Sequence, residues 1–341
     1  MKKILVFIFM FLFGLNFVSA KDNNSDMIKV SPKYADTKTF YDNILVDGIS
    51  TSGYSNNQMM QNFDIDFNNH YLYISYTYSI HPEIKKYRSS SMQVRIARIK
   101  LNSDNSLPSN YKNNMNLMVL NNSGHGQNFD VVGNNIWTDA NGYIDRFYDE
   151  YYSHNHSYIR LKYANGKFNV GSNDGSVLTG AMINSLNSNG FVKDLKEYDK
   201  NPEVSVDEAN HRIAIRNGSS IKVYKTDNNF YYKDSDLAHA FAIPSSINKD
   251  GYSNPLQGVS LYNDYLYTYY GASGGYGYIV VYNVYGASMI NYGGYRKVMF
   301  INLPSSREAE GIKVINGSVY IGVRYSGYNG WVNKIYKVSP R

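Results

Sequence analysis

The chain has 341 residues, 35 tyrosines, a formal net charge of +6 and no cysteine. The absence of cysteine excludes a bacterial lipoprotein, which needs a cysteine at its cleavage site, and it excludes disulfides as a source of stability. The basic residues form no cluster typical of nucleic-acid binding, so we expect no nucleic-acid partner. The mild positive charge favours an anionic surface such as a cell wall.

The first twenty residues predict a secretory signal peptide, residues 1–20. Lys2 and Lys3 form a basic head, an apolar run extends from Ile4 to Val18, and small residues precede an expected cleavage after Ala20. The segment is short for a membrane span, and an uncleaved anchor is the alternative. We therefore expect a secreted, extracellular protein of the kind that a Gram-positive bacterium exports.

Residues 21–38 form a polar segment that we expect to be loosely held, and residues 39–341 predict an all-β domain. Short runs rich in valine, isoleucine and tyrosine alternate with polar residues, and asparagine, glycine, aspartate and serine separate them. Because tyrosine suits strands, most of the tyrosines are expected to pack between them, and a minority is left for a binding surface.

Five segments of this domain repeat one pattern. Each opens with glutamine or glutamate, continues with a small or polar residue and an apolar residue, and leads through a strand and a turn to a second strand. The opening residues are Gln61, Gln127, Glu203, Gln257 and Glu310, and the small step is missing after Glu203. Five such units predict a five-bladed β-propeller, closed by a strand from Phe40. A β-sandwich followed by a second β-domain is the alternative.

These five opening residues, called the anchor residues from here on, are expected at equivalent places around the central channel. Their amides and carboxylates can hydrogen-bond to one another, to the backbone of the next blade or to channel water. Gln61, Gln127, Gln257 and Glu310 are also candidate ligand-binding residues, because they would form a polar funnel at one end of the channel.

His125 stands between Gly124 and Gly126, two residues before Gln127. The glycines permit positive φ values and a close backbone approach, which would let the imidazole face the channel mouth. His125 is therefore a candidate ligand-binding residue and the one candidate for a general base. The alternative is a hydrogen-bonded histidine at a turn, since no serine nucleophile or acidic partner stands at a diagnostic spacing.

We predict no cofactor and no metal site. His154 and His156 alternate and could share zinc, but the third ligand would have to be Asp149 or Glu150, and a solvated loop is the simpler interpretation. The segment from Asp64 offers oxygen ligands but lacks the spacing and the glycine of a calcium loop.

The stretch over residues 269–297 has the highest density of tyrosine and glycine in the chain. Its glycines do not form a dinucleotide-binding loop, because no helix follows them. The stretch predicts two strands joined by a glycine-rich hairpin. Its tyrosines, with Arg296 and Lys297, are candidates to stack on sugars and to meet phosphate charges, and packing at a sheet edge is the alternative.

Three short motifs stand in order along the chain: Gln-x-Phe-Asp from Gln61 to Asp64, Gly-His-Gly-Gln from Gly124 to Gln127, and Glu-x-Glu-Gly-Ile from Glu308 to Ile312. Over residues 45–341 they resemble the helveticin J family of large, heat-labile bacteriocins, and the related propeller domains of phage receptor-binding and teichoic-acid-operon proteins. The resemblance implies a five-bladed propeller that acts on or binds the envelope of other bacteria. The resemblance supplies no catalytic residue. The clear signal peptide is a difference from the family, because many relatives lack one as obvious.

These observations predict a secreted, bacteriocin-like protein that binds a wall glycan or an anionic teichoic acid of related bacteria and antagonises them. Only the resemblance implies that the protein kills these bacteria. Two alternatives stay open: a non-lethal wall-binding propeller or adhesin, and a hydrolase or lyase of an extracellular polymer with His125 as general base. The pattern favours a binding protein over an enzyme, and it leaves action on membranes open.

Overall fold

The computed structural model describes residues 34–41, 59–79, 92–121, 126–139, 156–162, 192–198, 202–249, 251–285, 296–299, 307–327 and 330–339. These residues form strands, joined by turns and by 3₁₀ segments at Tyr111–Asn114, Glu208–Asn210 and Asp234–Asp236. In this part of the chain, no helix is long and apolar enough to cross a membrane.

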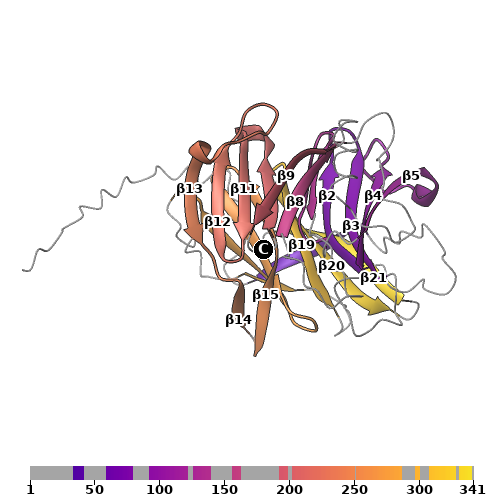
Figure 1. The fold of residues 1–341 in the computed structure, drawn as a ribbon. Helices are drawn as coiled ribbons and strands as arrows, with labels where there is room; N and C mark the ends of the chain where they lie inside the picture. The colour runs from indigo at the N-terminus through magenta and orange to yellow at the C-terminus, as the bar shows by residue number, and fades with distance from the viewer. Residues whose placement is uncertain are drawn as a thin grey trace, which may run out of the picture.

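The protein is a five-bladed β-propeller, as the five repeats predict. Figure 1 shows the blade that contains β11 (Arg212–Asn217) and β13 (Leu237–Ala242) on the opposite side of the molecule from the blade that contains β2 (Met59–Asp66) and β5 (Met115–Asn121). The innermost strands of the five blades contact one another in sequence, and the last contacts the first, so that they surround a closed central channel.

The first three blades are separate four-stranded antiparallel sheets. From the channel outwards, blade 1 consists of β2 (Met59–Asp66), β3 (Tyr71–Ser79), β4 (Met92–Lys100) and β5 (Met115–Asn121). Blade 2 consists of β6 (Phe129–Val132), β7 (Asn135–Asp139), β8 (His156–Lys162) and β9 (Val192–Tyr198). Blade 3 consists of β10 (Pro202–Asp207), β11 (Arg212–Asn217), β12 (Ser220–Lys225) and β13 (Leu237–Ala242).

The last two blades join at their outer edges into one nine-stranded sheet. Blade 4 consists of β15 (Tyr252–Tyr262), β16 (Tyr265–Gly271), β17 (Gly277–Asn283) and β18 (Arg296–Met299), and β14 (Ser246–Lys249) pairs with the start of β15. Blade 5 consists of β19 (Glu308–Ile315), β20 (Ser318–Gly327), β21 (Gly330–Ser339) and β1 (Tyr34–Tyr41).

The ring is closed by β1, which pairs antiparallel with β21 and parallel with β18. This strand begins at Tyr34, so the closing strand lies earlier than the expected start at Phe40, and the expected boundary between residues 38 and 39 falls inside it. The reason is its composition. Between Asp36 and Thr39 the strand carries only polar side chains, so the sequence shows no apolar alternation that would mark a strand there.

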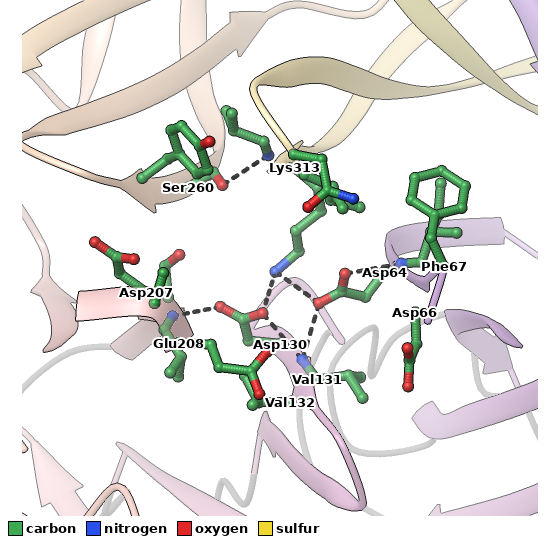
Figure 2. A pocket seen from close by; sticks show the side chains of 18 of the residues that line it. Asp64, Asp66, Phe67, Asp130, Val131, Val132, Asp207, Glu208, Ser260 and Lys313 are labelled. Carbon is green, nitrogen blue, oxygen red and sulfur yellow. Dashed lines mark hydrogen bonds and ion pairs between the residues drawn. The ribbon is translucent and has the colours of Figure 1, made fainter. Parts of the chain in front are cut away.

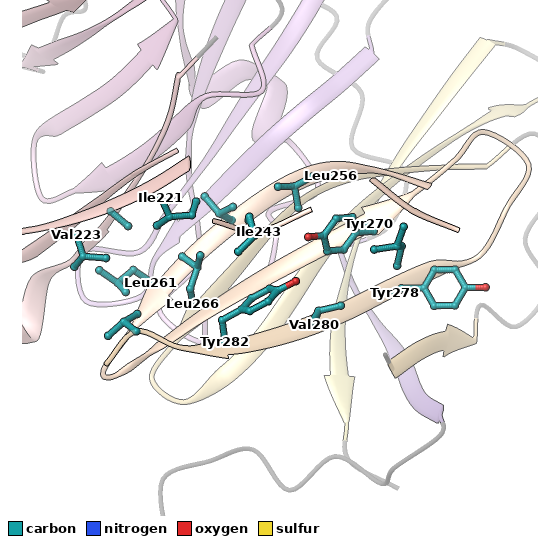
Figure 3. Packing of buried hydrophobic residues seen from close by; sticks show 14 residues of the cluster. Ile221, Val223, Ile243, Leu256, Leu261, Leu266, Tyr270, Tyr278, Val280 and Tyr282 are labelled. Atoms are coloured by element: carbon teal, nitrogen blue, oxygen red, sulfur yellow. The ribbon is translucent and has the colours of Figure 1, made fainter. Parts of the chain in front are cut away.

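The hydrophobic core fills the spaces between neighbouring blades, and Figure 3 shows the cluster between blades 3 and 4. Ile221 and Val223 of β12 are fully buried against Leu261 and Leu266 of blade 4. Each buried aliphatic side chain contributes about 1.5–3 kcal/mol relative to an exposed one. The core side chains with the greatest volume include tyrosines such as Tyr269, which confirms that strand packing explains many of the tyrosines.

Candidate functional site

Four anchor residues lie at or near the starts of the innermost strands, as the repeats predict, whereas Gln257 lies in the middle of β15, whose first residues pair with β14. Gln61, Gln257 and Glu310 fall in β-bulges, where two residues of the inner strand oppose one residue of its neighbour. Glu203 pairs regularly with Arg216, without a bulge. The inner strand of blade 3, where the small step is missing from the sequence, therefore lacks the bulge that these other blades have, and bulges are known to re-aim side chains beside functional sites.

The anchor residues are held by fixed partners at this end of the channel. Gln127 Nε2 donates a hydrogen bond of 2.9 Å to Gln257 Oε1, which links blades 2 and 4, two blades that are not neighbours in the ring. Glu203 accepts a charged hydrogen bond of 2.5 Å from Arg216. The Oε1 atom of Glu310 lies 2.7 Å from the Arg324 guanidinium within the same blade.

Three anchor residues also carry an acceptor that no described residue uses. The Oε1 atom of Gln61 and the Oε2 atoms of Glu203 and Glu310 are buried without a hydrogen-bond partner among the described residues. Burial raises the pKa of Glu203, although Arg216 opposes it, and it raises the pKa of Glu310 well above its ordinary value against the effect of Arg324. These oxygens can accept hydrogen bonds from water or from ligand hydroxyls, and ligand binding by the anchor residues stays a prediction.

His125 and His154 lie outside the described residues, so the predictions for them stay untested. The side chain of His156, at the start of β8, is likewise not described. Within the described residues, no three histidine, aspartate or glutamate side chains form a group that could hold a metal ion.

A second ring of side chains crosses the channel further along the inner strands. Its members stand three residues after the anchor, or two residues after it in blade 3, where the small step is missing. We call them the inner-ring residues; they are Asp64, Asp130, Ser205, Ser260 and Lys313. All five are buried, with exposed fractions between 1% and 6%.

Four inner-ring residues accept a hydrogen bond from a backbone N–H group of the next blade. In each case the donor follows the inner-ring residue of that blade by one position. The pairs are Val131 to Asp64 (2.9 Å), Val206 to Asp130 (2.6 Å), Leu261 to Ser205 (2.8 Å) and Val314 to Ser260 (2.9 Å). The side chains therefore tie each blade to the next around the ring.

Lys313, in the fifth blade, closes this ring with a charge instead of an acceptor. Figure 2 shows its ammonium group between two carboxylates, at 2.9 Å from Asp130 and 3.6 Å from Asp64. The same group donates a hydrogen bond of 2.8 Å to the carbonyl oxygen of Phe129. One buried cation thus compensates two buried carboxyl groups, which leaves one carboxyl without a full countercharge.

The two carboxyl groups differ in how well Lys313 stabilises their charges. Burial, followed by the neighbouring Asp130, raises the pKa of Asp64 to about 8, and Lys313 only partly opposes this. Burial lowers the pKa of Lys313, but the two carboxyl groups outweigh it and hold the pKa above its ordinary value. Asp64 is the more distant partner of Lys313, so it holds a proton near neutral pH.

We predict that Asp64 makes stability depend on pH. Because the pKa of Asp64 is about 8 in the folded protein and 3.8 as an ordinary carboxyl, the folded state binds more protons between these values. The free energy of unfolding should then fall as pH rises through this window. The amide of an Asp64→Asn variant mimics the protonated carboxyl, so its unfolding free energy, measured by urea denaturation between about pH 5 and pH 9, should fall less. Equal slopes for both proteins would contradict the assignment.

A cavity of about 220 Å³ opens beyond the inner ring, at the opposite end of the inner strands from the anchor residues. It is lined by all five inner-ring residues and by the turns that follow the inner strands. Asp66 and Asp207, at the ends of β2 and β10, and Glu208, just after β10, also line it, as Figure 2 shows. Asp207 forms an ion pair of 2.9 Å with Arg212. The cavity therefore has polar walls, but its buried charges already serve to hold the blades together.

Sequence reasoning missed the inner ring, although a signal for it exists. In the aligned repeats, Asp64, Asp130 and Lys313 occupy one position, and polar residues recur there between apolar ones. The oxygen ligands from Asp64 suggest a calcium site in the sequence, whereas in the structure the partner of the Asp64 carboxyl is the ammonium group of Lys313. A recurring polar residue inside an apolar strand indicates a buried polar network.

Comparison with known proteins supports the fold and leaves the family open. No protein-family model and no curated protein matches the chain. The tail fibre of Staphylococcus aureus phage P68 is similar in structure, with a TM-score of 0.54 and 16% identity over 89% of this chain and 52% of the fibre. The chain thus spans about half the length of that fibre.

Two further solved structures are more distant. They are an exo-β-1,3-galactanase from Phanerochaete chrysosporium (TM-score 0.39, 8% identity, 87% of this chain and 64% of the galactanase) and a mutant sialidase of Trypanosoma rangeli (TM-score 0.40, 7% identity, 88% and 57%). Likenesses of this size carry no argument about function. The resemblance to the helveticin J family stays a hypothesis, and the similarity to the tail fibre shows that the chain shares its propeller fold.

Proposed function

We propose that this protein is a secreted propeller that binds a polymer of the bacterial envelope, a wall glycan or a teichoic acid, and thereby antagonises related bacteria. The observation that carries the proposal is the propeller fold shared, over 89% of the chain, with the tail fibre of a phage of Staphylococcus aureus. The signal-peptide pattern of residues 1–20 and the net charge of +6 are consistent with export toward an anionic wall.

The state of the channel carboxylates favours binding over hydrolysis. A general acid or base must exchange a proton with substrate, and it needs a position within hydrogen-bond reach of it. Glu203, Glu310 and Asp130 are buried and engaged with Arg216, Arg324 and Lys313. Each of these carboxyl groups is held by a cation inside the protein, which suits a rigid binding platform.

The test uses purified protein, residues 21–341, with a heat-unfolded sample as control. Binding is measured on isolated Gram-positive cell walls, before and after removal of their teichoic acids, and viable counts are measured on several strains. We expect the folded protein to bind walls and to reduce the viability of selected strains.

The other outcomes separate the alternatives. Wall binding with full survival of every strain would replace antagonism by an adhesin function. Release of soluble wall fragments would indicate a hydrolase or lyase. No binding to any wall preparation would overturn the proposal.

A further inference from the structure

A surface groove of about 580 Å³ lies between the outer part of blade 3 and the end of β17 in blade 4. It is separate from the channel cavity, and it gathers basic, aromatic and apolar side chains and one carboxylate, Asp236. Its lining residues are Arg212, Lys225, Ser235, Asp236, Leu237, Ala238, His239 and Tyr285. These residues come from separate segments of blades 3 and 4, which only the propeller brings together.

The floor of the groove holds a rigid guanidinium group. Arg212 is buried, and its terminal nitrogens lie 2.9 Å from Asp207 and 3.2 Å from Asp264. Its Nε atom is buried without a hydrogen-bond partner among the described residues. Lys225 pairs with Arg212 across β11 and β12, and its side chain is exposed. Asp207 and Asp264 already compensate the charge of Arg212, so Lys225 is the cation of this cross-strand pair that is open to an anionic ligand.

The rim of the groove is unusually apolar for an exposed surface. Leu237 is 42% exposed and Tyr285 is 60% exposed, and they are two of the four exposed large hydrophobic residues in the described part of the chain. The ring of His239 lies edge-on to Tyr285, with ring centroids 4.7 Å apart. An aromatic ring held in this way offers a flat contact for carbon–hydrogen groups beside a polar tip.

We propose that this groove binds the phosphate-bearing polyol unit of an anionic wall polymer. The phosphate lies against Lys225 and His239, and the polyol carbons lie on Tyr285 and Leu237. This inference rests on the proposed wall-binding function and assigns it to one site. The same chemistry occurs in free glycerol phosphate, so the test separates polymer from monomer.

The surroundings of His239 support an anion site and add a pH dependence. Burial lowers the pKa of His239, as do Arg212 and Lys225, whereas Asp264 raises it; Asp236 and the Tyr285 hydroxyl complete the ionisable groups at the groove. A bound phosphodiester would favour the protonated ring and raise its pKa. Affinity should therefore increase as pH falls below the ordinary histidine value of 6.5.

The test measures binding of a poly(glycerol phosphate) teichoic acid, of free glycerol 3-phosphate and of a neutral wall polysaccharide by isothermal titration calorimetry. Replacing the exposed cation in Lys225→Gln should weaken polymer binding about tenfold, since a charge-assisted hydrogen bond is lost. Lys222→Gln is the matched control, because Lys222 is an exposed lysine of the same strand outside the groove.

The aromatic contact is tested by Tyr285→Ala, which should weaken polymer binding about fivefold. Tyr252→Ala is its control, since Tyr252 is 48% exposed and lies outside the groove. His239→Gln should abolish the rise in affinity at low pH. All variants are checked for an unchanged unfolding midpoint.

The outcomes distinguish this site from the wall-binding function itself. Selective loss in the groove variants supports the site, and weak monomer binding beside strong polymer binding identifies the polymer as the ligand. Groove variants that bind walls as well as their controls would overturn the groove and leave wall binding intact. Absence of wall binding by the unsubstituted protein would overturn both.

Discussion

Replacing Lys313 by methionine is expected to lower the free energy of unfolding by about 3–5 kcal/mol, the range for removing one partner of a buried ion pair. The methionine fills a similar volume, so the loss comes from charge and not from a cavity. Without the ammonium group, Asp130 loses its partner at 2.9 Å and the Phe129 carbonyl loses its hydrogen bond of 2.8 Å. The measurement is the urea-unfolding midpoint at neutral pH.

The effect can be assigned to the uncompensated carboxyl groups by a rescue variant. Combining Lys313→Met with Asp64→Asn and Asp130→Asn keeps acceptors for the backbone N–H groups of the next blades and removes both charges. We expect this triple variant to recover a large part of the lost stability. Lys222→Met, at an exposed position, serves as the control for a lost lysine. A cost for Lys313→Met as small as that of Lys222→Met would show that the ring does not depend on this charge.

The inner strands were predictable because their repeats combine two signals. Each anchor residue opens a run with an apolar alternation, and the spacing of the five runs gives one blade each. Even the missing step after Glu203 has a structural counterpart, since the inner strand of that blade lacks the bulge that the strands carrying Gln257 and Glu310 have.

The remaining features depend on contacts between distant segments, which local patterns do not record. The local sequence does not distinguish Lys313 from a solvent-facing lysine, because its partners Asp64 and Asp130 lie on other blades. The groove combines Arg212 with Tyr285, which are 73 residues apart in the numbering of the chain. Such sites follow from the way the blades are arranged, once the ring is closed.

Replacing Gly311 by alanine is expected to cost about 3 kcal/mol, because a strained backbone and a steric overlap act together. Gly311 belongs to the bulge of β19 and has φ of +72°. A Cβ atom there would overlap the Asn62 side-chain oxygen, and it would lie 3.1 Å from the Asn62 Cα atom of the next blade. The measurement is again the urea-unfolding midpoint, with an unchanged slope as evidence of the same folded state.

Asn62 cannot move aside without loss. Its Oδ1 atom accepts a hydrogen bond of 2.9 Å from the Phe63 N–H group, and its Nδ2 atom donates one of 2.7 Å to the Gln127 carbonyl oxygen in blade 2. The overlap at Gly311 would therefore disturb the junction of blade 5 with blade 1 and of blade 1 with blade 2.

Gly317→Ala separates the two contributions, since Gly317 has φ of +71° and the nearest atom to an added Cβ is the Tyr262 hydroxyl, at 3.7 Å. This variant carries the backbone strain without the overlap and should cost about 1 kcal/mol. The difference between Gly311→Ala and Gly317→Ala then measures how tightly the inner strands approach at the bulge. Equal losses of unfolding free energy would mean that the inner strands can move apart at little cost. Close packing of blades 5 and 1 would then not be required to close the ring.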